Sequence, residues 1–208
     1  MNKVYVLGVG PGSPDYVLPI VTKIVGQSEV VVGGQRNLDI FDTRGKQTMI
    51  IKNNLREVVD FIKAKKDTHK VAVLVSGDPG FYSMLNYLSG YFSREELEVI
   101  PGISSIQYLI CKMKTWWQDA YVTSLHGRMD ENFINIVKNN SKVALLTDYK
   151  LSPDAIARYL IANGIKDKKV TVGENLSYED ERIVEGSLEE ISQMNNFKMS
   201  VMVIENES

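Results

Sequence analysis

The feature that most restricts the fold is a regular alternation of short apolar runs with helical patterns along the first half of the chain. Apolar, β-rich runs indicate strands, and apolar residues at helical spacing fill the segments between them. The expected strands are 4–9, 30–32, 48–51, 71–75 and 98–100, and the expected helices are 19–26, 35–41, 54–66, 81–90 and 103–112. Because such alternation is typical of βαβ crossovers, we predict an α/β fold with a mainly parallel N-terminal sheet.

The pattern lapses at KMKTWWQD, residues 112–119, and then resumes with a different balance of strands and helices. The expected strands are 120–124, 142–147, 169–174, 182–186 and 198–204, and the expected helices are 130–139, 152–163 and 188–194. The last strands have little helix between them, which favours antiparallel pairs in a mixed C-terminal sheet. We therefore predict two α/β domains, residues 1–113 and 114–208.

Composition excludes several classes of protein. The 208 residues have a net charge of -2, and their 24 Lys and Arg form no dense basic block, so we expect no nucleic-acid partner. No apolar run reaches the length of a membrane span and no signal peptide precedes the first strand, which predicts a cytoplasmic protein without membrane contact. With one cysteine, Cys111, and two histidines, we expect neither an internal disulfide nor a metal site.

The first expected strand leads into GVGPGSPDY, a glycine-rich turn at residues 8–16. Its glycines permit positive φ and close approach to the backbone. A Walker A loop would need Gly-Lys-Ser/Thr, and a dinucleotide-binding G-x-G-x-x-G would need a glycine where Ser13 stands. Since Pro11 and Pro14 lack N–H groups, the turn is stiff and poor in donors. It does not match a phosphate cradle, and a tight turn without a ligand is the alternative interpretation.

Two further loops follow strands that we expect in the same sheet: SGDPGFYS at 76–83 and PGISS at 101–105. Open α/β sheets bind ligands at the carboxyl ends of their strands, where all three loops should meet. Ser104 and Ser105 open a helix and offer hydroxyl and N–H groups. Asp78 or Ser104 alone would suit an ordinary N-cap, but three glycine–proline turns at one end of a sheet favour a binding site.

Two further expectations concern which side chains are buried and which are exposed to solvent. Tyr82 and Tyr108 stand at helical spacing in their segments, so we expect both in the core. The acidic run 179–181 is expected at the solvated end of a hairpin.

Taken together, GVGPGSPDY, SGDPGFYS and VIPGISS resemble the motifs of the tetrapyrrole methylase family, and the resemblance extends over essentially the whole chain. It implies two α/β domains with S-adenosyl-L-methionine in the cleft between them, and methyl transfer to a corrinoid or porphyrinoid precursor. VVVGGQRNLDIF and SLHGR resemble the branch that methylates C5 of cobalt-precorrin-7, or precorrin-7 in the aerobic route, in cobalamin biosynthesis. That branch assignment rests on Gly33, Gly34, Arg36, His126, Gly127 and Arg128.

The same resemblance implies roles for individual residues. The implied cofactor contacts are Pro11, Gly77, Asp78, Phe81, Ser104, Ser105, Leu146, Thr147, Asn175 and Leu176. The implied substrate contacts are Gly10, Arg36 and Arg128, since planar arginine forks bind carboxylates bidentately. His126 is the candidate catalytic residue, able to bind a propionate or accept a proton after methylation, and a plain loop histidine is the alternative. Thr147 stands where relatives often carry methionine.

The resemblance also implies a homodimer. Because relatives pair the C5 step with a C15 methylation and decarboxylation, it further implies a separate partner protein for that second step. The alternatives are another tetrapyrrole methylase acting at a different carbon, or a relative with the same fold that modifies RNA or diphthamide. From other classes, a dinucleotide-dependent oxidoreductase or a non-catalytic sensor remains open. The missing third glycine, and the lack of an acidic residue ending a second strand, argue against the oxidoreductase.

Overall fold

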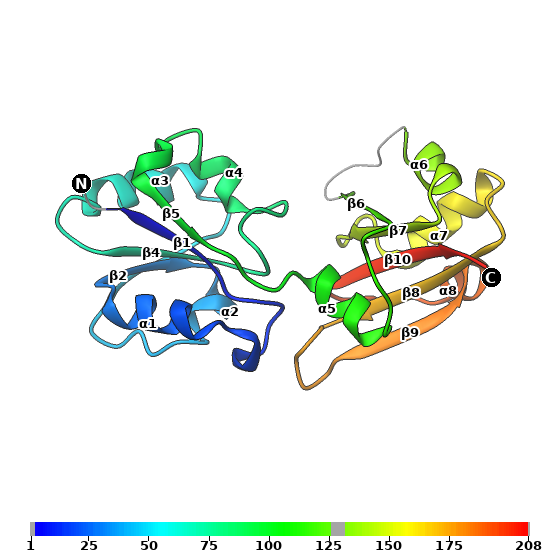
Figure 1. The fold of residues 1–208 in the computed structure, drawn as a ribbon, viewed down its shortest axis with the longest axis horizontal. Helices are drawn as coiled ribbons and strands as arrows, with labels where there is room; N and C mark the ends of the chain where they lie inside the picture. Colours follow the sequence, from blue (N-terminus) through cyan, green and yellow to red (C-terminus); the bar gives the residue numbers. More distant parts are fainter. Residues whose placement is uncertain (1–2, 126–131, 208) are drawn as a thin grey trace. The chain divides into compact units, whose positions relative to one another are not determined.

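The structure is a computed structural model that describes residues 3–125 and 132–207 (Figure 1). The chain divides into two compact units, residues 1–104 and 105–208, and each contains a five-stranded sheet. The prediction of two α/β domains is therefore confirmed. This division places the helix α5 (Ser105–Lys112) in the second unit, whereas the sequence interpretation placed it in the first domain.

The first unit is a parallel sheet with helices on both faces. Its strands are β1 (Val4–Gly8), β2 (Val30–Gly33), β3 (Gln47–Ile50), β4 (Val71–Val75) and β5 (Leu97–Ile100). All pairs are parallel, in the order β3-β2-β4-β1-β5. Its helices are α1 (Pro19–Gln27), α2 (Gln35–Leu38), α3 (Leu55–Lys65) and α4 (Met84–Leu88), with 3-10 turns η1 (Pro14–Tyr16) and η2 (Arg94–Glu96). The predicted parallel sheet is confirmed.

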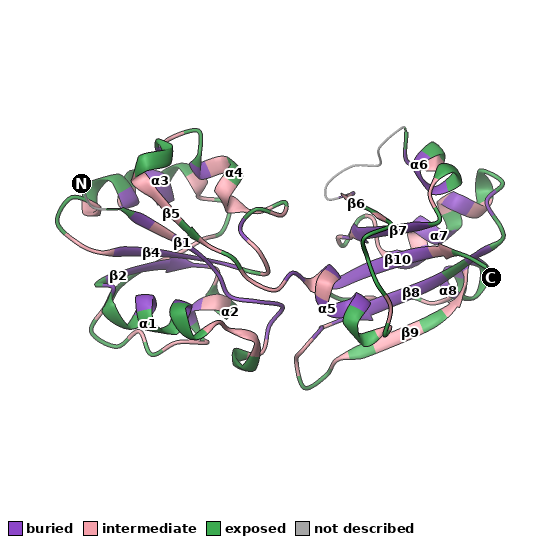
Figure 2. Ribbon diagram, viewed as in Figure 1, coloured by how far each residue is buried: buried purple, intermediate pink, exposed green. Residues whose placement is uncertain are grey.

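The central strands of this sheet are buried on both faces, as their continuous apolar sequences indicate. In β4, Val71, Val73 and Val75 pack on the side of α3 and α4, whereas Ala72 and Leu74 pack on the side of α1 and α2. This alternation is the period of two that a strand imposes. Figure 2 shows β4 and β2 as buried strands between two helical layers. Because the sheet is parallel, the carboxyl ends of its strands lie at one end of the unit.

The second unit is built on a mixed sheet. Its strands are β6 (Ala120–Ser124), β7 (Lys142–Leu146), β8 (Lys168–Glu174), β9 (Arg182–Ser187) and β10 (Ser200–Asn206). They follow the order β6-β7-β10-β8-β9, in which only the β6–β7 pair is parallel. The helices α6 (Phe133–Asn139), α7 (Pro153–Ala162) and α8 (Leu188–Gln193) pack on one face around a shared core. The expected mixed sheet is confirmed.

Some local expectations differ from the structure. The helix α4 begins at Met84 rather than at residue 81, because Tyr82 has φ 45° and lies outside the helical region. Tyr108 is buried as expected, but Tyr82 is 61% exposed, so its assignment to the core is wrong. No helix in the described ranges is long and apolar enough to cross a membrane.

Candidate functional site

The three loops named in the sequence analysis contact one another directly through glycine backbone. A Cβ atom on Gly8 would lie 2.5 Å from the nitrogen of Gly102 and 2.6 Å from the carbonyl oxygen of Gly77. A Cβ on Gly102 would collide with that same carbonyl oxygen. We call these three residues the glycine contact. Backbone atoms of neighbouring residues therefore occupy the space beside Gly8 and Gly102 where a side chain would stand. That space is not open to a ligand.

Backbone hydrogen bonds fix the first loop to the loop after β4. The N–H of Gly77 donates to the carbonyl of Gly10 at 2.8 Å, and the N–H of Gly10 donates back at 3.4 Å. The φ angles of Gly10 and Gly77 are 79° and 66°, in the left-handed region that favours glycine. Pro11, which follows directly, is buried. The site residues predicted in these two loops are therefore held side by side.

Asp78 joins the loop after β4 to the loop after β5. Its Oδ1 accepts a hydrogen bond from the N–H of Gly80 at 2.8 Å, and its Oδ2 accepts one from the N–H of Gly102 at 3.1 Å. The N-cap position of α4 is Ser83, so the alternative interpretation of Asp78 as an ordinary helix cap is wrong. Bonds between a carboxylate and backbone N–H groups are charge-assisted and stronger than neutral ones. Asp78 thus positions the glycine contact.

Ser104 and Ser105 complete this group of loops. Ser104 is buried, and its Cα would lie 3.5 Å from a Cβ built on Gly77. Ser105 is the first residue of α5, as expected. Phe81 follows Asp78 in the loop after β4, and its N–H donates to the Asp78 carbonyl at 3.2 Å. The structure therefore brings together the cofactor contacts predicted within the first unit, and Ser105 begins the second unit.

Arg36 is carried by the short helix α2, which follows β2 at the same end of the sheet. The neighbouring Asn37 accepts a hydrogen bond from the hydroxyl of Ser76 at 3.0 Å, which links α2 to the start of the loop after β4. Arg36 is exposed. The position suits a cation that meets a ligand at the carboxyl ends of the strands. His126 and Arg128 lie outside the described residues.

Two of the residues predicted to contact the cofactor from the second unit, Thr147 and Leu176, have side chains that pack inside that unit. Thr147 is buried, and its hydroxyl bonds to the carbonyl and the hydroxyl of Ser200 at 2.7 and 2.9 Å. Leu176 is 4% exposed, and its Cδ2 would lie 2.7 Å from a Cβ on Gly173. The side chains of Thr147 and Leu176 are thus engaged inside the unit, and Leu146 at the end of β7 is half-buried.

Asn175 and the preceding residue, Glu174, organise the segment after β8. Asn175 has φ 46°, donates from its N–H to the Met199 carbonyl at 3.0 Å, and donates from its side chain to Asp180. The buried carboxylate of Glu174 accepts bonds from the Nε of Arg182 at 2.7 Å and from the N–H of Lys198 at 2.6 Å. Sequence patterns gave no signal for this role of Glu174, because its contact with Arg182 depends on the register of β8 with β9 and Lys198 lies 24 residues away.

Two ionisable side chains join α5 to the β8–β9 connection. The Nζ of Lys112 lies 3.1 Å from Glu181 Oε1 and 5.1 Å from the centroid of the Tyr108 ring. Hydrogen bonds with Tyr108 and Glu181 raise the pKa of Lys112. Burial acts to raise the pKa of Glu181, but hydrogen bonds from the Ser177 N–H, Tyr108 and Lys112 outweigh it and lower that pKa. Both groups stay charged near neutral pH, and the expectation of a solvated hairpin end is wrong for Glu181.

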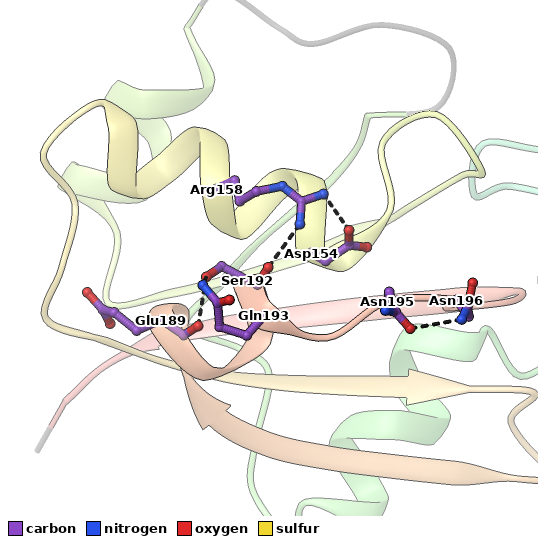
Figure 3. Close-up of polar contacts among 7 residues, drawn as sticks. All are labelled: Asp154, Arg158, Glu189, Ser192, Gln193, Asn195 and Asn196. Atoms are coloured by element: carbon purple, nitrogen blue, oxygen red, sulfur yellow. Dashed lines mark hydrogen bonds and ion pairs between the residues drawn. The ribbon is translucent and has the colours of Figure 1, made fainter.

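A hollow of about 550 Å³ lies elsewhere in the second unit, between α7 and α8. Arg158 at its wall donates to Asp154 Oδ2 at 2.5 Å and to the Ser192 carbonyl at 2.9 Å (Figure 3). Its lining includes none of the predicted site residues. Within residues 3–125 and 132–207, no group of three or more His, Cys, Asp or Glu side chains could hold a metal ion. The loops at the carboxyl end of the first sheet therefore remain the candidate site.

Comparisons with known proteins agree with the fold and motifs. The family model of the tetrapyrrole (corrin/porphyrin) methylases matches residues 3–192. The chain is 38% identical to a probable cobalt-precorrin-7 C(5)-methyltransferase from Methanocaldococcus jannaschii, over 97% of both chains. It is 34% identical to the cobalt-precorrin-7 C(5)-methyltransferase of Salmonella typhimurium, over 86% of this chain and 87% of that one.

A solved structure shares the fold at lower sequence identity. The uroporphyrin-III C-methyltransferase from Thermus thermophilus, solved in complex with S-adenosylhomocysteine, matches with a TM-score of 0.76 at 19% identity. The match covers 98% of this chain and 92% of that chain. At this identity the likeness establishes the fold.

Proposed function

Since the chain belongs to the tetrapyrrole (corrin/porphyrin) methylase family, we propose that it transfers a methyl group from S-adenosyl-L-methionine to C5 of cobalt-precorrin-7. Two relatives that carry this activity in their names match most of the chain at more than 30% identity. The reaction would make the chain a C-methyltransferase of cobalamin biosynthesis.

The charge of the three loops is the observation that carries the choice of cofactor. Residues 8–16, 76–83 and 101–105 contain the carboxylates Asp15 and Asp78 and no Lys or Arg. Loops with two carboxylates and no cationic side chain are poorly suited to a phosphate group, which needs cations or a row of free N–H groups. It suits S-adenosyl-L-methionine, which supplies an electrophilic methyl group on a positively charged sulfur.

In this proposal the loops bind and orient, and they perform no proton chemistry. The glycine contact gives the site a backbone wall that cannot shift, because its atoms are already in contact. Phe81 donates its N–H to the Asp78 carbonyl, and the Cα of Ser104 lies beside Gly77, so both residues would lie next to a ligand bound there. Holding two large reactants in an attack geometry can lower a barrier by about 7 to 11 kcal/mol. Positioning is therefore the main contribution of these residues.

The substrate side of the proposal rests on Arg36. Cobalt-precorrin-7 carries several carboxylates, and a guanidinium binds a carboxylate through two parallel hydrogen bonds. Arg36 lies at the carboxyl end of the first sheet, and Gly10 belongs to the first loop at that same end. Arg128 as a second carboxylate contact, and His126 as the catalytic residue, stay predictions.

The binding experiment measures the heat of binding of S-adenosylhomocysteine by calorimetry. NAD, a dinucleotide, and ATP, a nucleoside triphosphate, are titrated separately for comparison. We expect heat from S-adenosylhomocysteine alone. Asp78→Ala should weaken that binding by about 1 to 3 kcal/mol, because a charge-assisted tie between two loops is lost. Asp60→Ala removes an exposed carboxylate of α3, outside the three loops, and serves as the matched control with little change. Heat from NAD instead would favour the oxidoreductase.

The activity experiment uses methyl-labelled cofactor and cobalt-precorrin-7, and it locates the label by NMR. Label at C5 is the expected result, and label at another carbon would support a different tetrapyrrole methylase. Arg36→Ala should raise the KM for cobalt-precorrin-7 about 10- to 150-fold at constant S-adenosylhomocysteine affinity. Arg44→Ala is the control, since Arg44 is an exposed arginine paired with Asp42 in the same unit.

Three further parts of the proposal are carried over from the family resemblance. A homodimer, a separate partner protein for C15 methylation and decarboxylation, and a cytoplasmic location all stay predictions. Sedimentation of the purified chain tests the first. Copurification with a C15-methylating protein expressed beside it tests the second.

A further inference from the structure

Tyr82 is an exposed aromatic residue in an unfavourable backbone conformation. Its φ angle is 45°, and its exposed fraction is 61%. The other non-glycine residues with positive φ in the described ranges are Lys114, Asn175, Ser177 and Asn196. A bulky side chain in this region is a genuine outlier, and such a conformation costs on the order of a few RT. The fold therefore holds an aromatic side chain in water at an energetic cost.

The loop around Tyr82 is anchored on its N-terminal side. The carboxylate of Asp78 bonds to the N–H groups of Gly80 and Gly102, and Pro79 is buried. The rings of Phe81 and Tyr82 meet edge to face, with centroids 4.9 Å apart and planes at 83°. A half-buried ring thus supports an exposed one. The Tyr82 ring is exposed and does not contribute to the apolar core of this unit, so the core does not explain the strained backbone at Tyr82.

The position of Tyr82 points to a ligand. It lies between β4 and α4, in the loop that follows the carboxyl end of a central parallel strand (Figure 1). The other exposed large apolar side chains among the described residues of the first unit are Ile20 and Val99. Strain of this kind collects at ligand-binding positions, because a side chain that serves only the fold would relax.

We infer that the Tyr82 ring is a stacking contact for the flat, conjugated face of the tetrapyrrole substrate. This inference rests on the proposed function. A tyrosine ring offers a rigid apolar surface and a π-system with little loss of side-chain entropy, and conjugated rings stack on it. Arg36 and Tyr82 then bind different parts of the same substrate. The guanidinium of Arg36 binds peripheral carboxylates, and the ring of Tyr82 stacks on the macrocycle.

The test separates the ring from the backbone strain. Tyr82→Gly removes both, because glycine adopts positive φ without penalty, whereas Tyr82→Ala removes only the ring. Tyr82→Phe and Tyr82→Trp keep an aromatic face. Val99→Ala is the matched control, since it removes exposed apolar surface from β5 in the same unit. Each variant is tested for its melting temperature and for S-adenosylhomocysteine affinity by calorimetry.

The decisive measurement is the KM for cobalt-precorrin-7 with saturating S-adenosyl-L-methionine. Tyr82→Gly and Tyr82→Ala should raise it on the order of 10-fold, while Phe and Trp restore it to within about 3-fold. S-adenosylhomocysteine affinity should stay constant, and Tyr82→Gly should melt no lower than the wild type. An unchanged KM in Tyr82→Gly would overturn the inference. A joint loss of cofactor affinity and melting temperature would also overturn it, since Tyr82 would then support the loop.

A second measurement separates this inference from the proposed reaction. Equilibrium dialysis of cobyrinic acid, a stable corrinoid carboxylic acid, reports binding without methyl transfer. If the wild type binds cobyrinic acid but transfers no methyl group, the C5 reaction fails. Weaker binding by Tyr82→Gly would then still support the stacking contact. Equal binding by wild type and Tyr82→Gly would overturn it whatever the outcome of the transfer assay.

Discussion

Each unit joins distant loops through a carboxylate at or just beyond the end of a strand, but the surroundings of the two carboxylates differ. In the first unit, Asp78 bonds to two backbone N–H groups and to no side chain among the described residues, and the loops it joins touch through Gly8, Gly77 and Gly102. In the second unit Glu174 bonds to the side chain of Arg182 as well as to a backbone N–H group. One unit fixes its loops by the shape of the backbone, and the other fixes them by charged side chains.

The difference has a consequence for what each unit tolerates. Backbone atoms in contact leave no room for added volume, so a methyl group there forces strain or displacement. Side-chain networks can adjust to volume but depend on the charge state of their members. A site that must hold reacting groups at fixed distances is better served by the first arrangement. Each of the following changes tests this contrast, and the expected losses decrease in the order given.

Gly102→Ala should cause the largest loss, because its Cβ would meet the Gly77 carbonyl and the Gly8 backbone. We expect the free energy of unfolding of the first unit to fall by about 3 kcal/mol or more. Gly173→Ala is the counterpart in the second unit, where the Cβ would meet the flexible ends of Leu176 and Leu109, and about 1 kcal/mol is expected. Urea unfolding with peptide-level hydrogen exchange measures both. Equal losses would contradict the contrast.

Glu174→Gln should destabilise the second unit by about 2 kcal/mol, since a buried carboxylate that accepts two charge-assisted bonds becomes neutral. The control is Glu185→Gln, whose ion pair with Lys169 is about half exposed on both sides, and a change below about 0.5 kcal/mol is expected. Chemical denaturation at low and at high salt measures the two variants. Similar losses in both would show that burial of Glu174 adds nothing.

Thr147→Val should cost about 1 kcal/mol, because the bonds to Ser200 are lost while the volume is nearly kept. Thr147→Ser keeps the hydroxyl and separates that loss from packing effects. Since the hydroxyl is engaged inside the unit, S-adenosylhomocysteine affinity should not change in either variant. A tenfold loss of affinity in Thr147→Val at unchanged stability would instead show that the Thr147 hydroxyl contacts the cofactor.

Acid should weaken the second unit, and this is the smallest of the expected effects. Burial acts to raise the pKa of Asp154, but bonds from Ser152 and Arg158 outweigh it and lower that pKa, as other bonds do for Glu181. Carboxylates with lowered pKa stabilise the fold above their ordinary values of 3.8 and 4.5, and this stability is lost as the pH falls through the folded-state pKa. The loss should therefore appear below about pH 4.5.

Fluorescence can follow this acid transition in one unit alone, because Trp116 and Trp117 both belong to the second. The first unit also has carboxylates with lowered pKa, among them Asp42 and Glu96, so a probe confined to the second unit is needed. Asp154→Asn should flatten the pH dependence reported by tryptophan. An unchanged pH dependence in Asp154→Asn would contradict this expectation.

Sequence patterns predicted what depends on neighbours in the chain. The strand β4 and its flanking loop were predictable because five consecutive apolar residues, 71–75, are followed by the turn residues 76–80, SGDPG. The meaning of the glycines was not, because the atoms that fill the space beside Gly8 belong to Gly77 and Gly102. The exposure of Tyr82 was missed for a related reason, since helical spacing cannot register one residue with positive φ. Contacts between distant loops and single left-handed residues leave no periodic trace.

The order of strands in the two sheets has a consequence for synthesis on the ribosome. In the first sheet the last strand to be made, β5, lies at the edge beside β1, so four strands can already pair without it. In the second sheet the last strand, β10, lies in the centre between β7 and β8. Until residues 200–206 have emerged, β7 and β8 have no partner between them. The nascent chain thus carries a finished first sheet while the second is still two separate strand pairs, exposed to chaperones and to pairing with other chains.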